Sequence, residues 1–572
     1  MPNRASVQEG IDATMPVKPP SRWDREVDVV VLGSGGAGLT AAILAHDGGA
    51  KVLLLEKAPL FGGTTGVSGG MPWVPLNGHM ADVGASDSRE EALVYIRRLT
   101  LGREPDPGLL EVYVDTAPRM IESLEAHTPM KLYAPRSWGD YYGNLPGGKS
   151  AGRSLDDRPF DAKLLGEWAD KVRKSPMFPP MTMDEGGVGD ITKIDFTMIA
   201  ERVEKDVRTM GGALVAALFK GLLERGVETL SSTPGRELIM NDAGEVVGVR
   251  AERDGTAFHV GARRGVVIAT GGFEWNRELV RAFLKNEVTH PLSPPYNEGD
   301  GLIMAMEAGA ALANMNEAWW YPAMRDPTLE YDGKPLNILG SGRNMAGSII
   351  VNKRGKRFVN EGSTYMDMPK AFYVYDQVTQ DFPNMPPVWM VFDHRLKSGT
   401  PILTIMPNDP APDWVPQAPT LRELAGKIGV NADNLEATVE RFNRFAAEGV
   451  DPDFHRGELF FEHFRDEKWD KSKSLGPVER PPFYALPIYC GALGTNGGPR
   501  INQDAQVLNL RGWPIPGLFA AGNAAAGVFG PAYPGGGATI GPAMTFGYLA
   551  GKAAASQPTR NVPRRATRSR SE

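Results

Sequence analysis

The hydrophobic positions near the start of the chain form two short apolar runs with a helix-like segment between them. Four of the six residues at 27–32 are the β-branched valine, and residues 51–55 are apolar after Lys51, as expected for parallel strands buried on both faces. Residues 37–46 are rich in alanine and leucine and predict a helix. This order predicts a βαβ unit in an α/β fold.

Further along, helical and extended patterns alternate. Residues 86–128 and 199–226 have the spacing of helices, whereas residues 134–192 are rich in glycine, proline and aromatic side chains without a clear period. We expect this last segment to form a long, ordered stretch of loops. Residues 237–252 predict a hairpin, and residues 265–269 predict another buried strand.

The texture of the sequence changes at about residue 321 and changes back after residue 490. The stretch between carries many prolines and tryptophans, a predicted hairpin at Ser348–Asn360 and predicted helices near 420–447. A segment of different composition between two glycine-rich parts of a chain is typical of one domain inserted into another. We therefore predict a disordered arm (1–24), the first part of a dinucleotide-binding domain (25–320), an inserted α+β domain (321–490), the second part of the first domain (491–556) and a basic tail (557–572).

Composition narrows the classes of function. Contents of 42% hydrophobic and 23% charged residues are ordinary, but the 67 glycines exceed the usual share and gather in short runs. A formal net charge of −7 gives no reason to expect nucleic-acid binding. The single cysteine, Cys490, excludes an internal disulfide, and the eight histidines show no metal-binding spacing, so no metal is predicted.

Nothing in the chain predicts export or a membrane span. Residues 1–24 lack the apolar core of a signal peptide, and no apolar stretch is typical of a transmembrane helix. Together with the single cysteine, this predicts a cytoplasmic protein. The five arginines of the tail leave open peripheral contact with an anionic membrane.

A glycine-rich motif follows the first predicted strand. Residues 33–38 (GSGGAG) match G-x-G-x-x-G and open the predicted helix, and Glu56 stands at the end of the second strand. In such a motif Gly33 makes a tight turn, Gly35 lets the backbone approach a pyrophosphate, and Gly38 allows close helix–strand packing. The helix N-terminus favours phosphate, and Glu56 can accept hydrogen bonds from a ribose diol.

Three further glycine-rich segments favour FAD over NAD. They are residues 62–70 (GGTTGVSGG), 267–272 (VIATGG) and 517–523 (GLFAAGN). A cofactor with two ring systems and a long linker needs glycine-lined contacts from several separate segments. We therefore predict FAD.

Two other motifs match known patterns in the wrong context. Residues 143–150 satisfy the P-loop pattern, but no buried strand precedes them and no helix follows. Residues 66–70 satisfy the G-x-S-x-G pattern of hydrolases without a strong preceding strand. Neither a nucleoside triphosphatase nor a serine hydrolase is expected.

Taken together, these segments resemble the flavoprotein superfamily of fumarate reductases and 3-ketosteroid dehydrogenases over nearly the whole chain. The resemblance implies an α/β fold, with a Rossmann-like FAD-binding domain and an inserted α+β catalytic (capping) domain. It also implies that Ser68 lies near the flavin N5 and that Gly522–Asn523 reaches the isoalloxazine. The cofactor-side residues that the motifs and the resemblance indicate are Gly33, Ser34, Gly35, Gly36, Ala37, Gly38, Glu56, Lys57, Gly62, Gly63, Thr64, Thr65, Ser68, Gly69, Gly70, Ala269, Thr270, Gly271, Asp300, Gly522, Asn523, Thr539 and Ile540.

The segment Tyr533–Gly547 resembles the C-terminal stretch of 3-ketosteroid Δ1-dehydrogenases, which remove hydrogens from C1 and C2 of the steroid A-ring. The resemblance implies that the Tyr533 hydroxyl and the Gly537 N–H bind the C3 carbonyl. Taking a proton from the carbon beside a ketone puts negative charge on the ketone oxygen. Two donors there act as an oxyanion hole, an effect worth about 3–4 kcal/mol per donor.

One position separates the two branches of this superfamily. Four residues after Glu361, fumarate reductases carry an arginine as proton donor, whereas ketosteroid dehydrogenases carry a tyrosine as base for C2; this chain carries Tyr365. A tyrosine with its usual pKa of about 10 is protonated at neutral pH, so the site must lower that pKa or keep the deprotonated form transient. The residues around Tyr141 and Tyr142 resemble a loop of the family in which a tyrosine helps the base. We prefer Tyr141 over Tyr142 for this role.

The resulting hypothesis is FAD-dependent 1,2-desaturation of an apolar ketone, a 3-ketosteroid, with an electron acceptor that the sequence does not identify. Trp319, Trp320 and Phe358 are candidates for the pocket wall or for the core. One alternative is a desaturase that acts at C4–C5 or on another cyclic ketone. A fumarate-reductase-type enzyme is disfavoured by the missing arginine and by the absence of C-x-x-C-H. A non-enzymatic flavin-binding protein would leave the aligned tyrosines unexplained.

Overall fold

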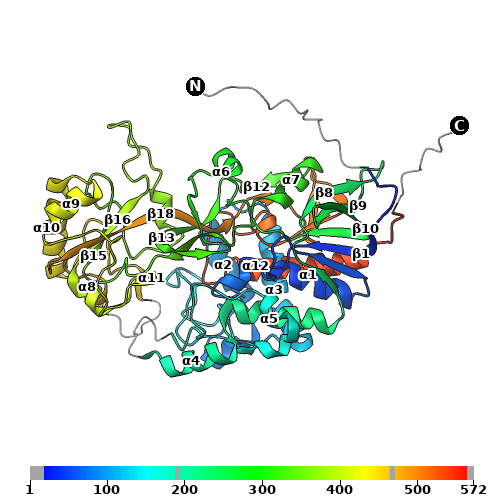
Figure 1. Cartoon of the computed structure of the whole chain (residues 1–572), viewed down its shortest axis with the longest axis horizontal. Helices are drawn as coiled ribbons and strands as arrows, with labels where there is room; N and C mark the ends of the chain where they lie inside the picture. The colour runs from blue at the N-terminus through cyan, green and yellow to red at the C-terminus, as the bar shows by residue number, and fades with distance from the viewer. Residues whose placement is uncertain (1–17, 187–192, 464–469, 563–572) are drawn as a thin grey trace.

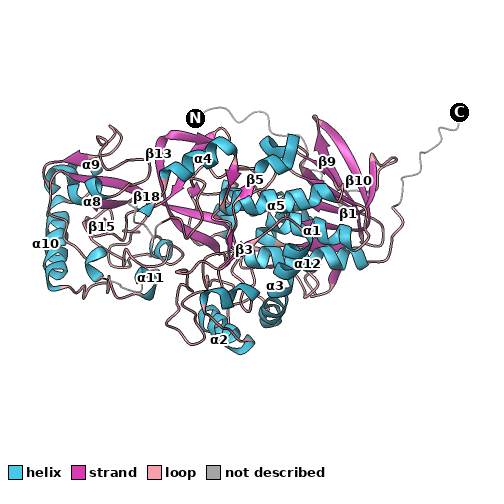
Figure 2. Cartoon of the chain, turned by 90° about the horizontal axis from the view of Figure 1, so that it is seen from below, coloured by secondary structure: helices cyan, strands magenta, loops and turns pink. Residues whose placement is uncertain are grey.

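The computed structural model of the chain describes residues 18–186, 193–463 and 470–562. Within them, two large β-sheets occupy the two halves of an elongated molecule (Figure 1). The strand β1 and the helix α1 lie near one end, and the helices α8, α9 and α10 lie at the other, in both Figure 1 and Figure 2.

The first sheet carries the glycine-rich motif. Its path is β20-β21-β10-β1-β2-β7, and the strands from β21 to β7 run parallel. The hairpin β8-β9 extends the sheet from β10, as predicted for residues 237–252. The strands are β1 (Arg25–Leu32), β2 (Val52–Leu55), β7 (Glu228–Leu230), β8 (Gly235–Met240), β9 (Val246–Arg253), β10 (Thr256–Ile268), β20 (Gln506–Leu508) and β21 (Pro514–Ala520).

Three helices pack beside this sheet: α1 (Gly36–Asp47), α5 (Met210–Glu224) and α12 (Ile540–Ser556). Ten of the twelve residues of α1 are buried, so this helix is covered almost all round. Its neighbours α5 and α12 supply that cover. The predicted strand–helix–strand unit is confirmed, and α12 brings the end of the chain back to its beginning (Figure 2).

The second sheet has the order β14-β13-β18-β16-β15, with neighbours antiparallel, and β11 and β17 pair with its long strand β18. The helices α9 and α10, predicted near 420–447, cover a separate apolar cluster beside it. The elements are β11 (His290–Pro291), β13 (Ala318–Tyr331), β14 (Lys334–Leu339), β15 (Ser348–Val351), β16 (Val388–Phe392), α8 (His394–Gly399), β17 (Gln417–Ala418), α9 (Leu421–Ile428), α10 (Ala432–Glu448) and β18 (Phe483–Thr495). The division into domains at 320 and 490 stays a prediction.

The predicted hairpin at Ser348–Asn360 is wrong. Only its first half is a strand, β15, and that strand pairs with β16. A tight turn follows, in which the Gly355 N–H donates to Asn352 O at 2.9 Å. After the turn, the Arg357 side chain is buried against Glu361 and Asp451, so the chain bends inward instead of returning along β15.

The other predicted segments divide into shorter elements. Residues 86–128 contain two helices, as expected, and residues 134–186 contain only short strands and a 3-10 helix. The helical stretch 199–226 is interrupted at Asp206, which adopts a left-handed conformation. The remaining helices and strands are α2 (Arg89–Thr100), α3 (Pro107–His127), β3 (Leu132–Tyr133), β4 (Asp156–Asp157), β5 (Phe160–Asp161), α4 (Phe196–Lys205), β6 (Val207–Arg208), α6 (Arg277–Phe283), α7 (Asp300–Glu307), β12 (Leu312–Ala313), α11 (Phe460–His463) and β19 (Gly498–Pro499).

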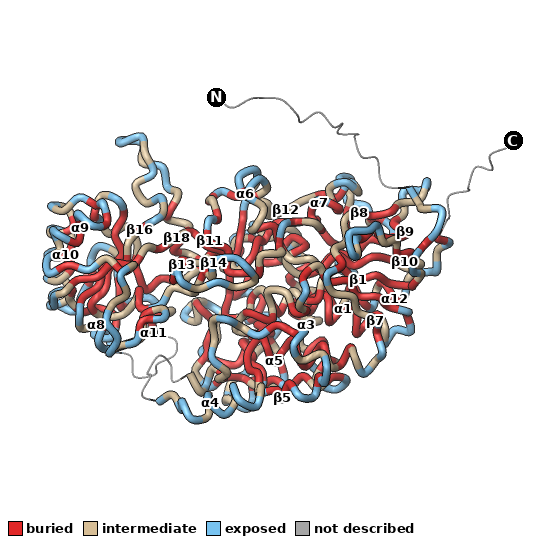
Figure 3. The backbone as a smooth tube through the Cα atoms, in the orientation of Figure 1, coloured by how far each residue is buried: buried red, intermediate tan, exposed pale blue. Residues whose placement is uncertain are grey.

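The ends of the described chain pack against the first sheet. Trp23, from the predicted arm, and Val562, from the predicted tail, share a small apolar cluster, and the Arg560 side chain donates to Arg264 O at 2.8 Å. The other four arginines of the tail lie outside the described residues. Among the described residues no helix is long and apolar enough to cross a membrane. Figure 3 shows that the buried residues follow the strands of both sheets.

Candidate active site

Two glycines at the turn between β1 and α1, Gly33 and Gly38, are packed too closely to carry a side chain. A side-chain carbon at Gly33, where φ is +99°, would lie 2.3 Å from Ala269 O, and one at Gly38 would lie 2.0 Å from Gly33 O. At Gly35 the nearest such neighbour is the Thr65 hydroxyl at 3.5 Å. Gly35 therefore leaves room on its cavity side, where the helix N-terminus can meet a phosphate.

Glu56 lines the same cavity at the end of β2. Its carboxylate accepts hydrogen bonds from the Ser34 N–H at 3.0 Å and the Ser34 hydroxyl at 2.5 Å, and from the Ala58 N–H at 2.8 Å. A carboxylate has about four acceptor positions. The remaining capacity suits a ribose diol. Lys57 and Asp300 also line the cavity but pair with each other, with Nζ and Oδ2 2.6 Å apart.

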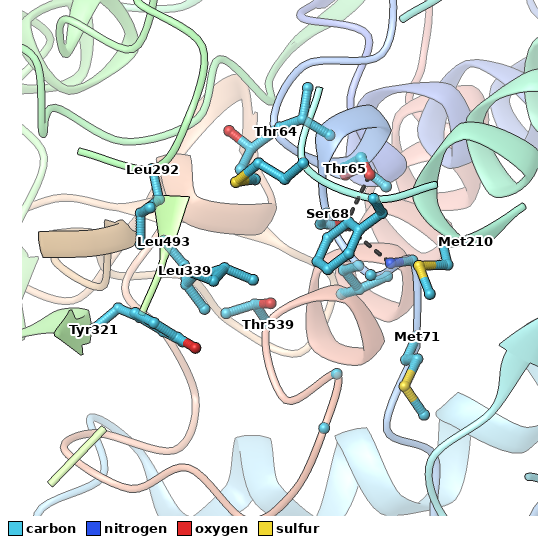
Figure 4. Close-up of a pocket in the computed structure, with 18 of the residues that line it drawn as sticks. Thr64, Thr65, Ser68, Met71, Met210, Leu292, Tyr321, Leu339, Leu493 and Thr539 are labelled. Carbon is cyan, nitrogen blue, oxygen red and sulfur yellow. Dashed lines mark hydrogen bonds between the residues drawn. The ribbon is translucent and has the colours of Figure 1, made fainter. Parts of the chain in front are cut away.

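The segment after β2 is fastened to both neighbouring elements. The Thr65 hydroxyl accepts from the Gly36 N–H at 3.0 Å, and the Thr64 hydroxyl accepts from the Asn297 amide at 2.9 Å. The Ser68 hydroxyl donates to Thr65 O at 2.8 Å (Figure 4). These bonds hold a ribbon of small residues along one wall of the cavity.

The predicted cofactor-side residues come together in one cavity of about 1140 Å³. Only two of them, Gly38 and Gly62, do not line it, because Gly38 packs on Gly33 and Gly62 packs against Val215 of α5. Thr270 in the wall has a buried hydroxyl without a hydrogen-bond partner among the described residues. A bound cofactor could supply one. The glycine cradle, the free acceptor capacity of Glu56 and this hydroxyl all fit a dinucleotide.

Three tyrosines meet at another part of the cavity. The hydroxyls of Tyr141 and Tyr365 are 3.0 Å apart, and the ring centroids of Tyr365 and Tyr533 are 5.5 Å apart. The rings of Tyr141 and Tyr533 stack at 5.9 Å. Gly537, with φ at +97°, also lines this cavity, at the turn that precedes α12. The four residues that the sequence selected for catalysis are therefore neighbours.

The surroundings of Tyr365 and Tyr533 keep both hydroxyls protonated. Burial, together with the neighbouring Tyr141 and Tyr533, raises the pKa of Tyr365 well above its usual value. Burial also raises the pKa of Tyr533, although hydrogen bonds with Tyr365, Thr539 and the Gly537 backbone oppose that rise. The sequence left open whether the site lowers the pKa of Tyr365 or keeps its deprotonated form transient. The structure raises that pKa, so the first option is not met.

Backbone contacts place Tyr141 beside the turn that carries Tyr533. The Tyr141 N–H donates to Pro534 O at 3.0 Å, and Asp140 forms a β-bridge with Gly535. Tyr142 points elsewhere, because its hydroxyl donates to Asp367 at 2.5 Å. Tyr141 is therefore the tyrosine of this pair whose hydroxyl contacts that of Tyr365.

The segment that matches the P-loop pattern, residues 143–150, supports the same part of the structure. The Lys149 N–H donates to the Asp140 carboxylate at 2.9 Å, and the Lys149 ammonium pairs with Glu91 at 2.9 Å. This loop supports Asp140, and its lysine is already paired with an acidic side chain.

The aromatic wall differs from the sequence-based candidates. Trp320 is buried in the core and Phe358 packs towards Phe372, and neither lines the cavity. Trp319 lies behind Tyr533 and donates to Asn523 at 2.9 Å. Alternation along β13 could have singled out Tyr321, whose ring is 4.7 Å from that of Tyr365 and which lines the cavity.

Two other lining residues were also missed. Phe461 lies 4.8 Å from the Tyr141 ring, and Arg343 reaches the cavity from the segment between β14 and β15. No periodicity or motif marks either residue in the sequence. Apolar side chains complete this part of the wall, among them Leu292, Leu339 and Leu493 (Figure 4).

Comparison with known proteins identifies this architecture. The family model described as "FAD binding domain" matches residues 28–540. The chain belongs to this flavoprotein family. FAD is its cofactor, and the chain is an FAD-dependent oxidoreductase.

Two relatives of this flavoprotein are named for dehydrogenation of cyclic ketones. A 4-oxocyclohexanecarboxylate 2-dehydrogenase from Sinomonas cyclohexanicum is 40% identical over 540 residues, which covers 93% of each chain. A 3-oxosteroid 1-dehydrogenase from Mycobacterium tuberculosis is 38% identical over 559 residues, which covers 92% of this chain and 98% of the relative. The chain is thus homologous to dehydrogenases of 3-oxosteroids and of smaller cyclic ketones.

A solved structure resembles the flavoprotein closely. The 3-ketosteroid Δ1-dehydrogenase from Sterolibacterium denitrificans, in complex with 1,4-androstadiene-3,17-dione, superimposes with a TM-score of 0.85 at 34% identity. The match covers 93% of this chain and 99% of that one. The mixed α/β fold expected from the sequence is thereby confirmed.

Proposed function

We propose that this flavoprotein introduces a C1–C2 double bond into 3-ketosteroids. The observation that carries the proposal is the meeting of Tyr141, Tyr365 and Tyr533 beside Gly537, in the cavity that also contains the glycine cradle. When bound, FAD supplies the acceptor for the hydride that leaves C1. The protein's own residues bind the ketone, remove the proton from C2 and exclude water.

Tyr533 and Gly537 would hold the ketone oxygen. Both line the cavity, and the rise in the pKa of Tyr533 keeps its hydroxyl protonated and able to donate. As the proton leaves C2, negative charge grows on the ketone oxygen, and fixed donors in a buried site stabilise that charge by about 3–4 kcal/mol each. Such donors favour the enolate over the ketone and so increase the acidity of C2.

Tyr365 would take the C2 proton. Its hydroxyl, 3.0 Å from that of Tyr141, has a partner to which its own proton can be passed, and the phenolate so formed takes the proton from C2. Since burial raises the pKa of Tyr365, its phenolate exists only transiently at neutral pH. The reaction then needs the ketone and the base together, which the position of Tyr365 beside Tyr533 supplies.

The apolar wall supports a ring substrate. Leu292, Leu339, Leu493 and Tyr321 face the cavity near Thr539 (Figure 4). Fused hydrocarbon rings would bury their surface there, at about 25 cal/mol per Å² removed from water. A smaller cyclic ketone is the second candidate, because the relative from Sinomonas cyclohexanicum acts on a single ring.

The test uses the purified holoenzyme with an artificial electron acceptor. 4-Androstene-3,17-dione and 5α-androstane-3,17-dione are supplied separately, and the position of the new double bond is identified by NMR. We expect a C1–C2 double bond from both. Product only at C4–C5, or no turnover of either steroid, would overturn the proposal.

A further inference from the structure

The cavity is lined by basic side chains as well as by the three tyrosines. Arg343 and Arg395 are among them, and we call these two residues the basic end. Arg395 belongs to α8, which lies far from β1 and the glycine cradle in Figure 1. The acidic side chain of Glu462 also lines the cavity. A pocket for an apolar ketone alone has no need of two arginines.

Arg343 is the more buried member of the basic end, with 7% of its surface exposed. Its two terminal nitrogens donate to backbone oxygens, Nη1 to Glu361 O and Nη2 to Ser363 O at 2.9 Å. A guanidinium has five N–H groups, so these bonds leave donors over. No carboxylate of the described residues lies within ion-pair distance of it.

The neighbouring acidic groups are already engaged. Glu361 pairs with Arg357 at 2.7 Å and with Arg456 at 3.4 Å. Glu462 accepts from the Gly457 N–H at 2.8 Å and from the Ser474 hydroxyl at 3.0 Å. A buried cation without a close anion is costly in free energy, and a ligand that brings an anion relieves that cost.

Arg395 also lines the cavity, and its closest partner among the described residues is likewise a backbone carbonyl. Its Nη2 donates to Pro477 O at 2.6 Å, and the nearest oxygen of Asp393 is 4.0 Å away. That carboxylate is itself held by the N–H groups of Glu479 and Arg480, each at 3.1 Å. Two arginines with carbonyl partners therefore present positive charge to one end of the site.

We propose that the basic end binds a carboxylate, so that the preferred substrate is a cyclic ketone with an acid group remote from the ketone. This inference rests on the proposed function, because it assumes that the ketone lies at Tyr533 and Gly537. Arg343 is the principal ligand, since the fork of a guanidinium matches the two oxygens of a carboxylate. The carboxylate comes either from a single oxo-ring acid or from the side chain of an oxosteroid acid.

The position of Arg343 also joins recognition to catalysis. The two carbonyl oxygens that it holds belong to residues 361 and 363, just before Tyr365. A carboxylate on the same guanidinium would fix that loop, and with it the base. We therefore expect acidic substrates to gain in kcat/KM over neutral analogues of the same shape.

The experiment compares acids with their methyl esters on the holoenzyme. One pair is 4-oxocyclohexanecarboxylate and its ester, and the other is 3-oxo-4-androstene-17β-carboxylate and its ester. A charged hydrogen bond is worth about 1.5–3 kcal/mol, so kcat/KM should favour the acid about ten- to hundredfold in one pair. The pair that shows the preference identifies the source of the carboxylate.

The variant Arg343→Met tests the assignment. Its absolute rates can fall because the loop loses its tether, so the quantity compared is the acid-to-ester ratio, which should drop to about one. Arg422→Gln, which removes an arginine exposed on α9, should leave the ratio unchanged. If Arg343→Met does not fold, wild-type inhibition decides: cyclohexanecarboxylate should inhibit at least about tenfold more strongly than cyclohexanecarboxamide.

The outcomes separate the two proposals. Equal rates for acids and esters in both pairs, or an acid preference that survives in Arg343→Met, would overturn the carboxylate site and leave ketone desaturation standing. Equal inhibition by the acid and the amide would do the same where the variant does not fold. No desaturation of the two neutral androgens would instead overturn the proposed function, whatever the four acids and esters show.

Discussion

Replacing Tyr365 with phenylalanine tests the proposed base directly. The change removes one hydroxyl, which lies 3.0 Å from that of Tyr141, and keeps the ring that packs 4.7 Å from Tyr321. The lost hydrogen bond should cost only about 1 kcal/mol of stability. Loss of a general base slows a reaction by about 10²–10⁴-fold, which raises the barrier by about 3–5 kcal/mol. We therefore expect a folded, FAD-containing variant whose kcat falls by at least a hundredfold.

Two assays separate proton removal from the later steps. Steady-state turnover with an artificial acceptor gives kcat, and loss of deuterium from a C2-labelled 3-ketosteroid without acceptor follows proton removal alone. Both rates should fall together in Tyr365→Phe. Tyr142→Phe is the matched control, because its hydroxyl binds Asp367 and its side chain does not line the cavity. It should keep both rates within about twofold of the wild type.

One result would refute this reasoning. If Tyr365→Phe keeps most of its kcat, or loses turnover while C2 exchange continues at the normal rate, then Tyr365 is not the base. The tyrosine cluster would then have a packing role at this position.

Three further predictions concern the same cavity. Tyr533→Phe should lower kcat by about 10²–10³-fold, measured by steady-state turnover, because one donor to the ketone oxygen is lost while the Gly537 N–H remains. Gly38→Ala should abolish FAD retention, measured as flavin absorbance per protein after gel filtration, because its Cβ would lie 2.0 Å from Gly33 O. The control Gly426→Ala, whose Cβ would have no neighbour within 4 Å, should retain FAD. Burial raises the pKa of Tyr365, so its reactive phenolate stays scarce but becomes more abundant as pH rises. We therefore expect kcat to increase about tenfold per pH unit between about 7 and 9. A flat pH profile of kcat would contradict a titrating phenol.

The cofactor half of the molecule could be predicted from the sequence because the residues that determine it lie close together in the chain. The turn at Gly33, the start of α1 and the end of β2 at Glu56 lie within 25 residues of one another, and each requires a particular residue type. Close packing at Gly33 and Gly38 explains why the motif tolerates no side chain there. Such signals survive in a single sequence.

The second sheet was less readable because its pairings join distant segments. β15 pairs with β16, about 40 residues later, across a loop that no period marks. The segment Ser348–Asn360 has the alternation and turn of a hairpin, yet the buried charges at Arg357 and Glu361 decide its course. Tertiary contacts of this kind override a local pattern.

The residues on the substrate side of the cavity were also only partly predicted from the sequence. The resemblance selected the tyrosines, and the structure places Tyr141, Tyr365 and Tyr533 together. Arg343 and Phe461 could not be found, because one arginine or one phenylalanine among many carries no spacing signal. Their significance comes only from which loop and which cavity they face.

The tyrosine site is assembled from two separately anchored parts. Tyr141 and the Tyr533 turn are joined by backbone contacts, and Asp140 behind them is fixed by the Arg153 guanidinium at 2.7 Å. Tyr365 arrives from the other side, on a loop held by Arg343. The 3.0 Å contact between Tyr141 and Tyr365 is therefore a junction between these two parts. A base placed at such a junction responds to anything that shifts one part against the other, so a substrate that contacts both parts can complete the site as it binds.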